Sequence, residues 1–244
     1  MTYCVGLRLD RGLVFMSDTR TNGGLDNIST YRKLFTWTVP GERMITLMTA
    51  GNLATTQALV GLLDERSKAP ADRDPSLFAC STMFQVAQLV GNTLREVIAE
   101  QRGVGQEATT TFDASVIVGG QIGDMEPRLF MIYPEGNFVE TSSDTQFLQI
   151  GEIKYGRPIL VRAYEPDMSF EAAIKLLLVS FDSTIKANLT VGLPLDIAVY
   201  EADSLAAPRE RRVDLDDTYY QSISQGWGDA LKQAFEVLPD FHFD

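Results

Sequence analysis

Short apolar runs separated by turn residues fill the first fifty positions of the chain. Two predicted β-hairpins share this arrangement: residues 3–9 with 13–17, around Asp10-Arg11-Gly12, and residues 33–39 with 43–49, around Pro40-Gly41-Glu42. Apolar runs bounded by Gly, Pro and Asp at this spacing are typical of strands joined by tight turns. The polar stretch 18–30 between the two hairpins is predicted to be a loop.

Helical periodicity follows the hairpins. The clearest case is 169–186, where six apolar residues share one helical face: Phe170, Ile174, Leu177, Leu178, Phe181 and Ile185. The other predicted helices are 53–66 after Asn52 as N-cap, a segment capped by Ser81 that runs to about 101, 153–161 despite Pro158, and 217–237. Residues 67–78, with two prolines and mixed charges, are predicted to be a loop.

Further strand patterns lie between and after these helices. They cover residues 114–118, 128–133, 138–141, 147–150, 196–200 and 211–215. Hairpin-linked strands alternating with paired helices predict an α+β protein in which mainly antiparallel sheets are covered by helices. With no linker or repeat, 1–244 is interpreted as a single domain, in which about 203–244 form a C-terminal extension.

Composition narrows the possible functions. A net charge of −12 disfavours nucleic-acid binding, which depends on clustered Lys and Arg. No apolar stretch is long enough to span a membrane. Two widely spaced cysteines, Cys4 and Cys80, and the lack of a signal-peptide pattern indicate a cytoplasmic protein. The single histidine, His242, disfavours histidine-based zinc sites and a Ser-His-Asp triad, so we expect no metal and no cofactor.

Thr2 offers a different nucleophile. If Met1 is removed, the hydroxyl and the α-amine of Thr2 form a nucleophile and a base within one residue. The α-amine titrates near about 7.7–8.0 in model compounds, so part of it is neutral at physiological pH. Many chains begin Met-Thr without any such role, and the residues that follow decide the interpretation.

Those residues resemble the start of a proteasome-type β-subunit. The resemblance rests on TYCVGLRLDRGLVFMSDTRT at 2–21, which ends in Asp18-Thr19-Arg20, on Lys33, and on Thr49-Ala50-Gly51. The resemblance is strongest over the first fifty or so residues. Within the family, the chain resembles the bacterial Anbu branch most. The resemblance implies an N-terminal-nucleophile (Ntn) hydrolase, with a four-layer αββα sandwich of two mainly antiparallel sheets flanked by helices.

The resemblance also implies roles for single residues. Thr2, Asp18 and Lys33 would be catalytic, and the Gly51 amide would form the oxyanion hole, with Arg20 in support. Each has an ordinary alternative: Asp18 at a strand end suits an Asx-turn, Lys33 suits a solvated surface, and Gly51 suits a strand–helix junction.

Three positions depart from the family pattern. Asn188 stands where the family has an aspartate, and Val191 where it has a serine; Glu152 occupies the position of a second serine. We expect Glu152 and Asn188 to support the nucleophile less well than the usual residues do, which would reduce the efficiency of hydrolysis.

The resemblance further implies self-assembly into a homo-oligomeric ring or an open helical assembly. The substrate would be a peptide or protein, and an unknown activator is possible. Two alternatives stay open: an assembly or scaffold protein with a weak or vestigial site, and an Ntn amidase acting on a small-molecule amide. The aromatic segment 217–237 would either pack on its own subunit or form an intersubunit contact.

Overall fold

The structure is a computed structural model that describes residues 2–22, 28–68, 75–104 and 111–243, so Met1 lies outside the described residues. Its first sheet has the strand order β10-β1-β2-β11-β12, and all of its neighbouring strands are antiparallel. The strands are β1 (Tyr3–Leu9), β2 (Gly12–Asp18), β10 (Phe147–Gly151), β11 (Leu195–Glu201) and β12 (Arg209–Val213). β2 is buried along its whole length, which explains why its sequence is apolar rather than alternating.

The second sheet is also antiparallel, with the order β5-β6-β7-β8-β9. Its strands are β5 (Leu34–Val39), β6 (Arg43–Gly51), β7 (Ala114–Ile122), β8 (Arg128–Ile132) and β9 (Phe138–Glu140). The two predicted hairpins are confirmed as β1–β2 and β5–β6. They belong to different sheets, so the first fifty residues supply two adjacent strands to each layer.

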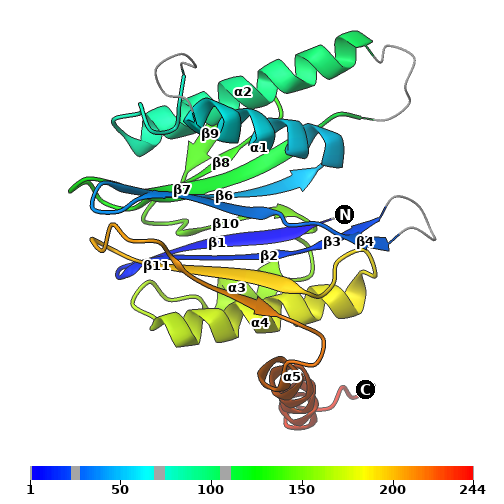
Figure 1. The fold of residues 1–244 in the computed structure, drawn as a ribbon. Coiled ribbons are helices and arrows are strands. Elements are labelled where there is room, and N and C mark those ends of the chain that lie inside the picture. Colours follow the sequence, from blue (N-terminus) through cyan, green and yellow to red (C-terminus); the bar gives the residue numbers. More distant parts are fainter. Residues whose placement is uncertain (1, 23–27, 69–74, 105–110, 244) are drawn as a thin grey trace.

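Helices cover the outer face of each sheet (Figure 1). The second sheet is covered by α1 (Leu53–Lys68) and α2 (Met83–Val104), and the first by α3 (Arg157–Ala163) and α4 (Phe170–Ala187). The four-layer αββα sandwich expected from the sequence is therefore confirmed. In the part of the chain that the structure describes, no helix is both long enough and apolar enough to cross a membrane.

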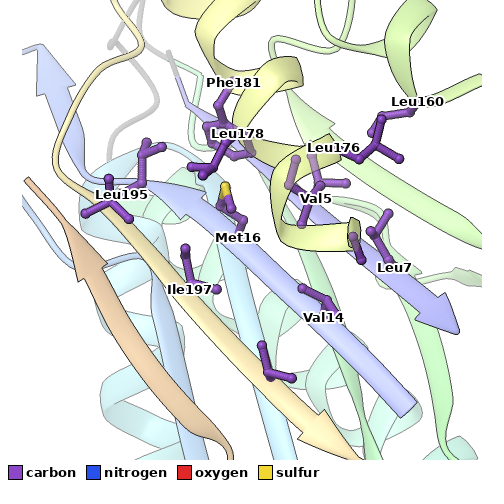
Figure 2. Packing of buried hydrophobic residues seen from close by; sticks show 14 of the residues in the cluster. Val5, Leu7, Val14, Met16, Leu160, Leu176, Leu178, Phe181, Leu195 and Ile197 are labelled. Atoms are coloured by element: carbon purple, nitrogen blue, oxygen red, sulfur yellow. The ribbon is translucent and has the colours of Figure 1, made fainter. Parts of the chain in front are cut away.

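Three apolar layers hold the sandwich together. Between the sheets lie side chains such as Phe15, Met48 and Ile117. A second layer joins the first sheet to its helices, where Phe181 and Leu178 of α4 face strand residues such as Met16 (Figure 2). A third layer joins α1 and α2 to the second sheet. The apolar stripe predicted for 169–186 thus lies against β1, β2 and β11.

The predicted loop 18–30 was wrong in part, because it contains two paired strands. β3 (Arg20–Asn22) and β4 (Ile28–Thr30) pair in antiparallel register, with Thr21 opposite Ser29. Their polar composition has no alternation of apolar and polar positions, so a strand pattern is not visible in the sequence.

Several boundaries also differ from the prediction. The helix expected at 153–161 begins instead at Arg157, because Pro158 is favoured in the first turn of a helix and disfavoured in its interior. The cap of α2 is Thr82 rather than Ser81: the Gln85 amide donates to Thr82 Oγ1 at 3.2 Å. The last strand lies at Arg209–Val213, two residues before the predicted 211–215.

The last helix, α5 (Thr218–Glu236), lies beyond α4 at the edge of the molecule (Figure 1). Its first half packs on its own subunit, since Tyr220 is buried and its hydroxyl lies 3.3 Å from Asp182 Oδ1. Its second half does not, because Leu231 is 50% and Phe235 76% exposed. Packing on the same subunit is therefore confirmed for the first half, and an intersubunit contact stays a prediction for the second.

Candidate active site

Four strands end or begin at one end of the sandwich and bring the predicted site residues to the same place. Thr2 precedes β1 and Asp18 ends β2, and both belong to the first sheet. Lys33 precedes β5 and Gly51 ends β6, and both belong to the second. Because β1 and β2 are antiparallel with Cys4 opposite Ser17, the register places Asp18 beside the first residues of β1.

An ion pair between Asp18 and Lys33 joins the two sheets. Lys33 Nζ lies 2.8 Å from Asp18 Oδ1, and the same oxygen accepts the Tyr3 amide at 3.0 Å. Asp18 is fully buried and Lys33 is 5% exposed, so the predicted lysine is not a solvated surface residue. Burial raises the pKa of the Asp18 carboxyl above its ordinary value, and the nearby Lys33 ammonium opposes that rise.

Two backbone groups complete the surroundings of Lys33. Its ammonium donates to the Arg20 carbonyl oxygen at 2.6 Å, and its own carbonyl accepts the Thr49 amide at 3.0 Å. The Arg20 guanidinium points elsewhere and donates to the Leu189 carbonyl at 2.9 Å. Arg20 therefore supports the site through its main chain, while its side chain ties β3 to the loop after α4.

A cavity of about 660 Å³ lies against these residues. Thr2, Lys33 and Gly51 line it together, and α1 contributes side chains such as Gln57. Thr2 is only 7% exposed, so its environment is largely protein rather than water.

Gly51 requires the conformational freedom of glycine. Its φ is +120°, and a Cβ at this position would collide with the carbonyl oxygen of Asp113, the residue before β7. The expected N-cap follows at once, since Asn52 Oδ1 accepts the Thr55 amide at 3.2 Å. The N-terminus of α1 therefore lies directly after Gly51, where its dipole favours negative charge.

Glu152 and Asn188, which come from distant parts of the sequence, contact each other beside Thr2. Asn188 Nδ2 donates to Glu152 Oε2 at 2.9 Å, and the Glu152 amide donates to the Thr2 carbonyl at 2.7 Å. Glu152 is 7% exposed. The structure thus brings together all seven residues predicted for the site or its support.

Several contributors were missed by sequence reasoning. The Tyr3 amide and the Arg20 carbonyl are backbone groups, which carry no signal in the sequence. Thr190 holds Asn188 in place and has no distinctive pattern around it. Gln57 could have been found, since it lies on the first turns of a helix predicted to begin beside Gly51. Among the residues that the structure describes, no group of three or more His, Cys, Asp or Glu side chains is placed to hold a metal ion.

Comparison with known proteins found similarity to one family model, to solved structures and to curated proteins. A family model described as proteasome subunit matches residues 2–199. Anbu (ancestral beta-subunit) from Yersinia bercovieri is 44% identical, with a TM-score of 0.92 over 99% of this chain and 100% of that one. The Pseudomonas aeruginosa Anbu complex, solved as a helical assembly, is 46% identical, with a TM-score of 0.93 over 99% and 98%. Proteasome subunit beta 2 of Pyrobaculum calidifontis is 26% identical over 216 residues, covering 86% of this chain and 93% of its own length.

Proposed function

Because this chain belongs to the proteasome subunit family, in its Anbu branch, we propose that it is a threonine-type amide hydrolase with Thr2 as nucleophile after removal of Met1. The observation that carries the proposal is the buried Asp18–Lys33 pair, because Lys33 lines the same cavity as Thr2. A buried ion pair beside a hydroxyl is a means of lowering the proton affinity of that hydroxyl.

The proposed reaction begins with attack of Thr2 Oγ1 on a peptide carbonyl. The neutral α-amine of Thr2, directly or through a water molecule, takes the hydroxyl proton as the new C–O bond forms. Collapse of the tetrahedral intermediate breaks the C–N bond and passes the proton to the leaving amine. Water then hydrolyses the ester of Thr2 by the same steps, which releases the acid and restores the free threonine.

Lys33, Asp18 and Gly51 each have a separate part in this reaction. The Lys33 ammonium favours the alkoxide character that develops on Thr2 Oγ1, and Asp18 holds the ammonium at 2.8 Å. The Gly51 amide, at the end of β6 and before α1, is proposed to donate to the oxyanion. The dipole of α1 adds to the stabilisation of negative charge there.

We propose a peptide or protein as substrate, because the chain belongs to the proteasome subunit family and its site is a cavity lined by both sheets and α1. Self-assembly is proposed as well, since the related Pseudomonas aeruginosa protein was solved as a helical assembly. Location in the cytoplasm remains a proposal from the composition alone.

Intact mass and labelling by a threonine-directed electrophile test the nucleophile together. Removal of Met1 and one covalent adduct on wild type are expected, with no adduct on Thr2→Ala and slower labelling of Thr2→Ser, which keeps a hydroxyl. Thr145→Ala is the matched control, because this exposed threonine precedes β10 at the opposite end of the sandwich. Equal labelling of Thr2→Ala would show that another residue reacts. A processed protein that never labels would favour the assembly role instead.

A further inference from the structure

The carboxylate of Glu152 is buried without a cation beside it. The residue is 7% exposed, and Oε2 accepts a hydrogen bond from the neutral Asn188 amide at 2.9 Å. In the described ranges of the chain, no lysine or arginine forms an ion pair with it. Because transferring a carboxylate out of water is costly, buried carboxylates are normally paired with a positive group.

Asn188 is oriented so that it can only donate to Glu152. Its Oδ1 accepts both the Thr190 amide at 3.0 Å and the Thr190 hydroxyl at 2.6 Å, which leaves Nδ2 facing the carboxylate. Asn188 is also the C-cap of α4, where the helix dipole is negative. The dipole therefore disfavours an anion at this position and favours a cation.

The neighbouring charged groups do not supply that cation. Two of them form ion pairs with other residues: Lys186 pairs with Asp182, and Lys33 pairs with Asp18. The Arg20 guanidinium donates to the Leu189 carbonyl, and Lys154 is exposed to solvent. None of these four positive groups is free to approach Glu152 without giving up a contact or leaving water. A positive group of the main chain would supply the missing charge without either cost.

The backbone of Thr2 lies next to the backbone of Glu152. Tyr3 is opposite Gly151 in the β1–β10 ladder, and the Glu152 amide donates to the Thr2 carbonyl at 2.7 Å. Gly151 has a φ of +85° and lets the two chains approach at this point, where a Cβ would collide with the Thr2 carbonyl. Glu152 is thus held against the same residue whose nitrogen becomes an α-amine when Met1 is removed.

We propose that Glu152 is the counter-ion of the Thr2 α-ammonium group and that Asn188 holds the carboxylate in position for it. Glu152 is a positioning residue, which orients the amine toward Thr2 Oγ1. The inference rests on the proposed function only in requiring removal of Met1. Glu152 and Asn188 are then not weaker substitutes for the usual family residues. Together they supply a carboxylate and an amide that holds this carboxylate in position.

A carboxylate within about 4–6 Å of an amine favours the charged form of the amine and raises its pKa by about one to three units. Glu152→Gln keeps the size of the side chain and removes the charge. The variant should therefore lower the pH at which the Thr2 amine becomes neutral by about one unit. Glu201→Gln is the matched control, because it removes one exposed charge at the opposite end of the same sheet.

Two pH profiles measure this shift on the full-length processed protein. The first is reductive methylation of the α-amine followed by mass spectrometry, which does not depend on catalysis. The second is the rate of labelling of the Thr2 hydroxyl. In Glu152→Gln both midpoints should move down by about one pH unit, and in Glu201→Gln neither should move.

The outcomes separate this inference from the proposed function. Equal methylation midpoints in Glu152→Gln and wild type overturn the inference, and so does a protein that retains Met1. A shifted methylation midpoint in a protein that never labels supports the pairing and rejects Thr2 as the nucleophile.

Discussion

Replacing Lys33 by methionine would leave the Asp18 carboxylate buried without its counter-ion. The two groups lie 2.8 Å apart, and at an effective dielectric constant of 20 their attraction is about 6 kcal/mol before desolvation is considered. Removing one partner of such a buried pair typically destabilises a protein by about 3–5 kcal/mol. The Arg20 carbonyl would lose its donor as well, which adds about 1 kcal/mol at any pH.

Protonation of Asp18 limits this penalty and makes it depend on pH. An unpaired carboxyl can always take up a proton, which costs about 1.4 kcal/mol for each pH unit above its unfolded pKa of about 3.9. The destabilisation by the unpaired Asp18 carboxyl therefore cannot exceed about 4 kcal/mol at pH 7 and about 1.5 kcal/mol at pH 5. Because burial raises the folded pKa of Asp18, the stability of the variant is greatest below the unfolded pKa and is lost as pH rises toward the folded one.

Urea unfolding of wild type and Lys33→Met at pH 5 and pH 7, at one protomer concentration, measures the difference. We expect the variant to lose about 2–3 kcal/mol more at pH 7 than at pH 5. The double variant Asp18→Asn/Lys33→Met is the control, since it has no charge to titrate and should lose the same amount at both pH values. An equal loss for Lys33→Met at both pH values would show that Asp18 is not a buried unpaired carboxylate in that variant, and the reasoning would fail.

Two further predictions concern the oxyanion donor and the C-terminal helix. Gly51→Ala should slow labelling of Thr2 by about a hundredfold or more, because a Cβ at a φ of +120° would meet β7 and displace the proposed oxyanion donor. Gly41→Ala is the control and should label normally, since Gly41 has a φ of +76° and open space around it. Similar labelling rates for the two variants would reject Gly51 as the donor. Deletion of 229–244 keeps the contact of Tyr220 with α4 but removes exposed apolar side chains such as Phe235. Smaller species are expected in sedimentation, with a circular dichroism spectrum that loses only the helical signal of the deleted part of α5. Sedimentation like that of the full-length assembly would exclude this segment from the interface.

The pattern of the sequence determined most of the elements, and the resemblance to proteasome-type β-subunits implied the four layers. Hairpins around 10–12 and 40–42 and the stripe on 169–186 were all found correctly, because turn residues and apolar periodicity are local properties of the chain. The β3–β4 pair was missed because its polar residues leave no such pattern. Its pairing depends on contacts between segments and not on composition.

For the site, the sequence determined which residues to consider, and the tertiary structure decided what each one does. The order of Thr2, Asp18, Lys33 and Gly51 pointed to one family, but the ion pair at 2.8 Å exists only because two sheets meet at one end of the sandwich. Likewise, the sequence alone shows only that Glu152 stands where the family pattern has a serine. Only the fold places Glu152 between Asn188 and the backbone of Thr2, because hydrogen bonds and burial over such sequence separations are set by packing.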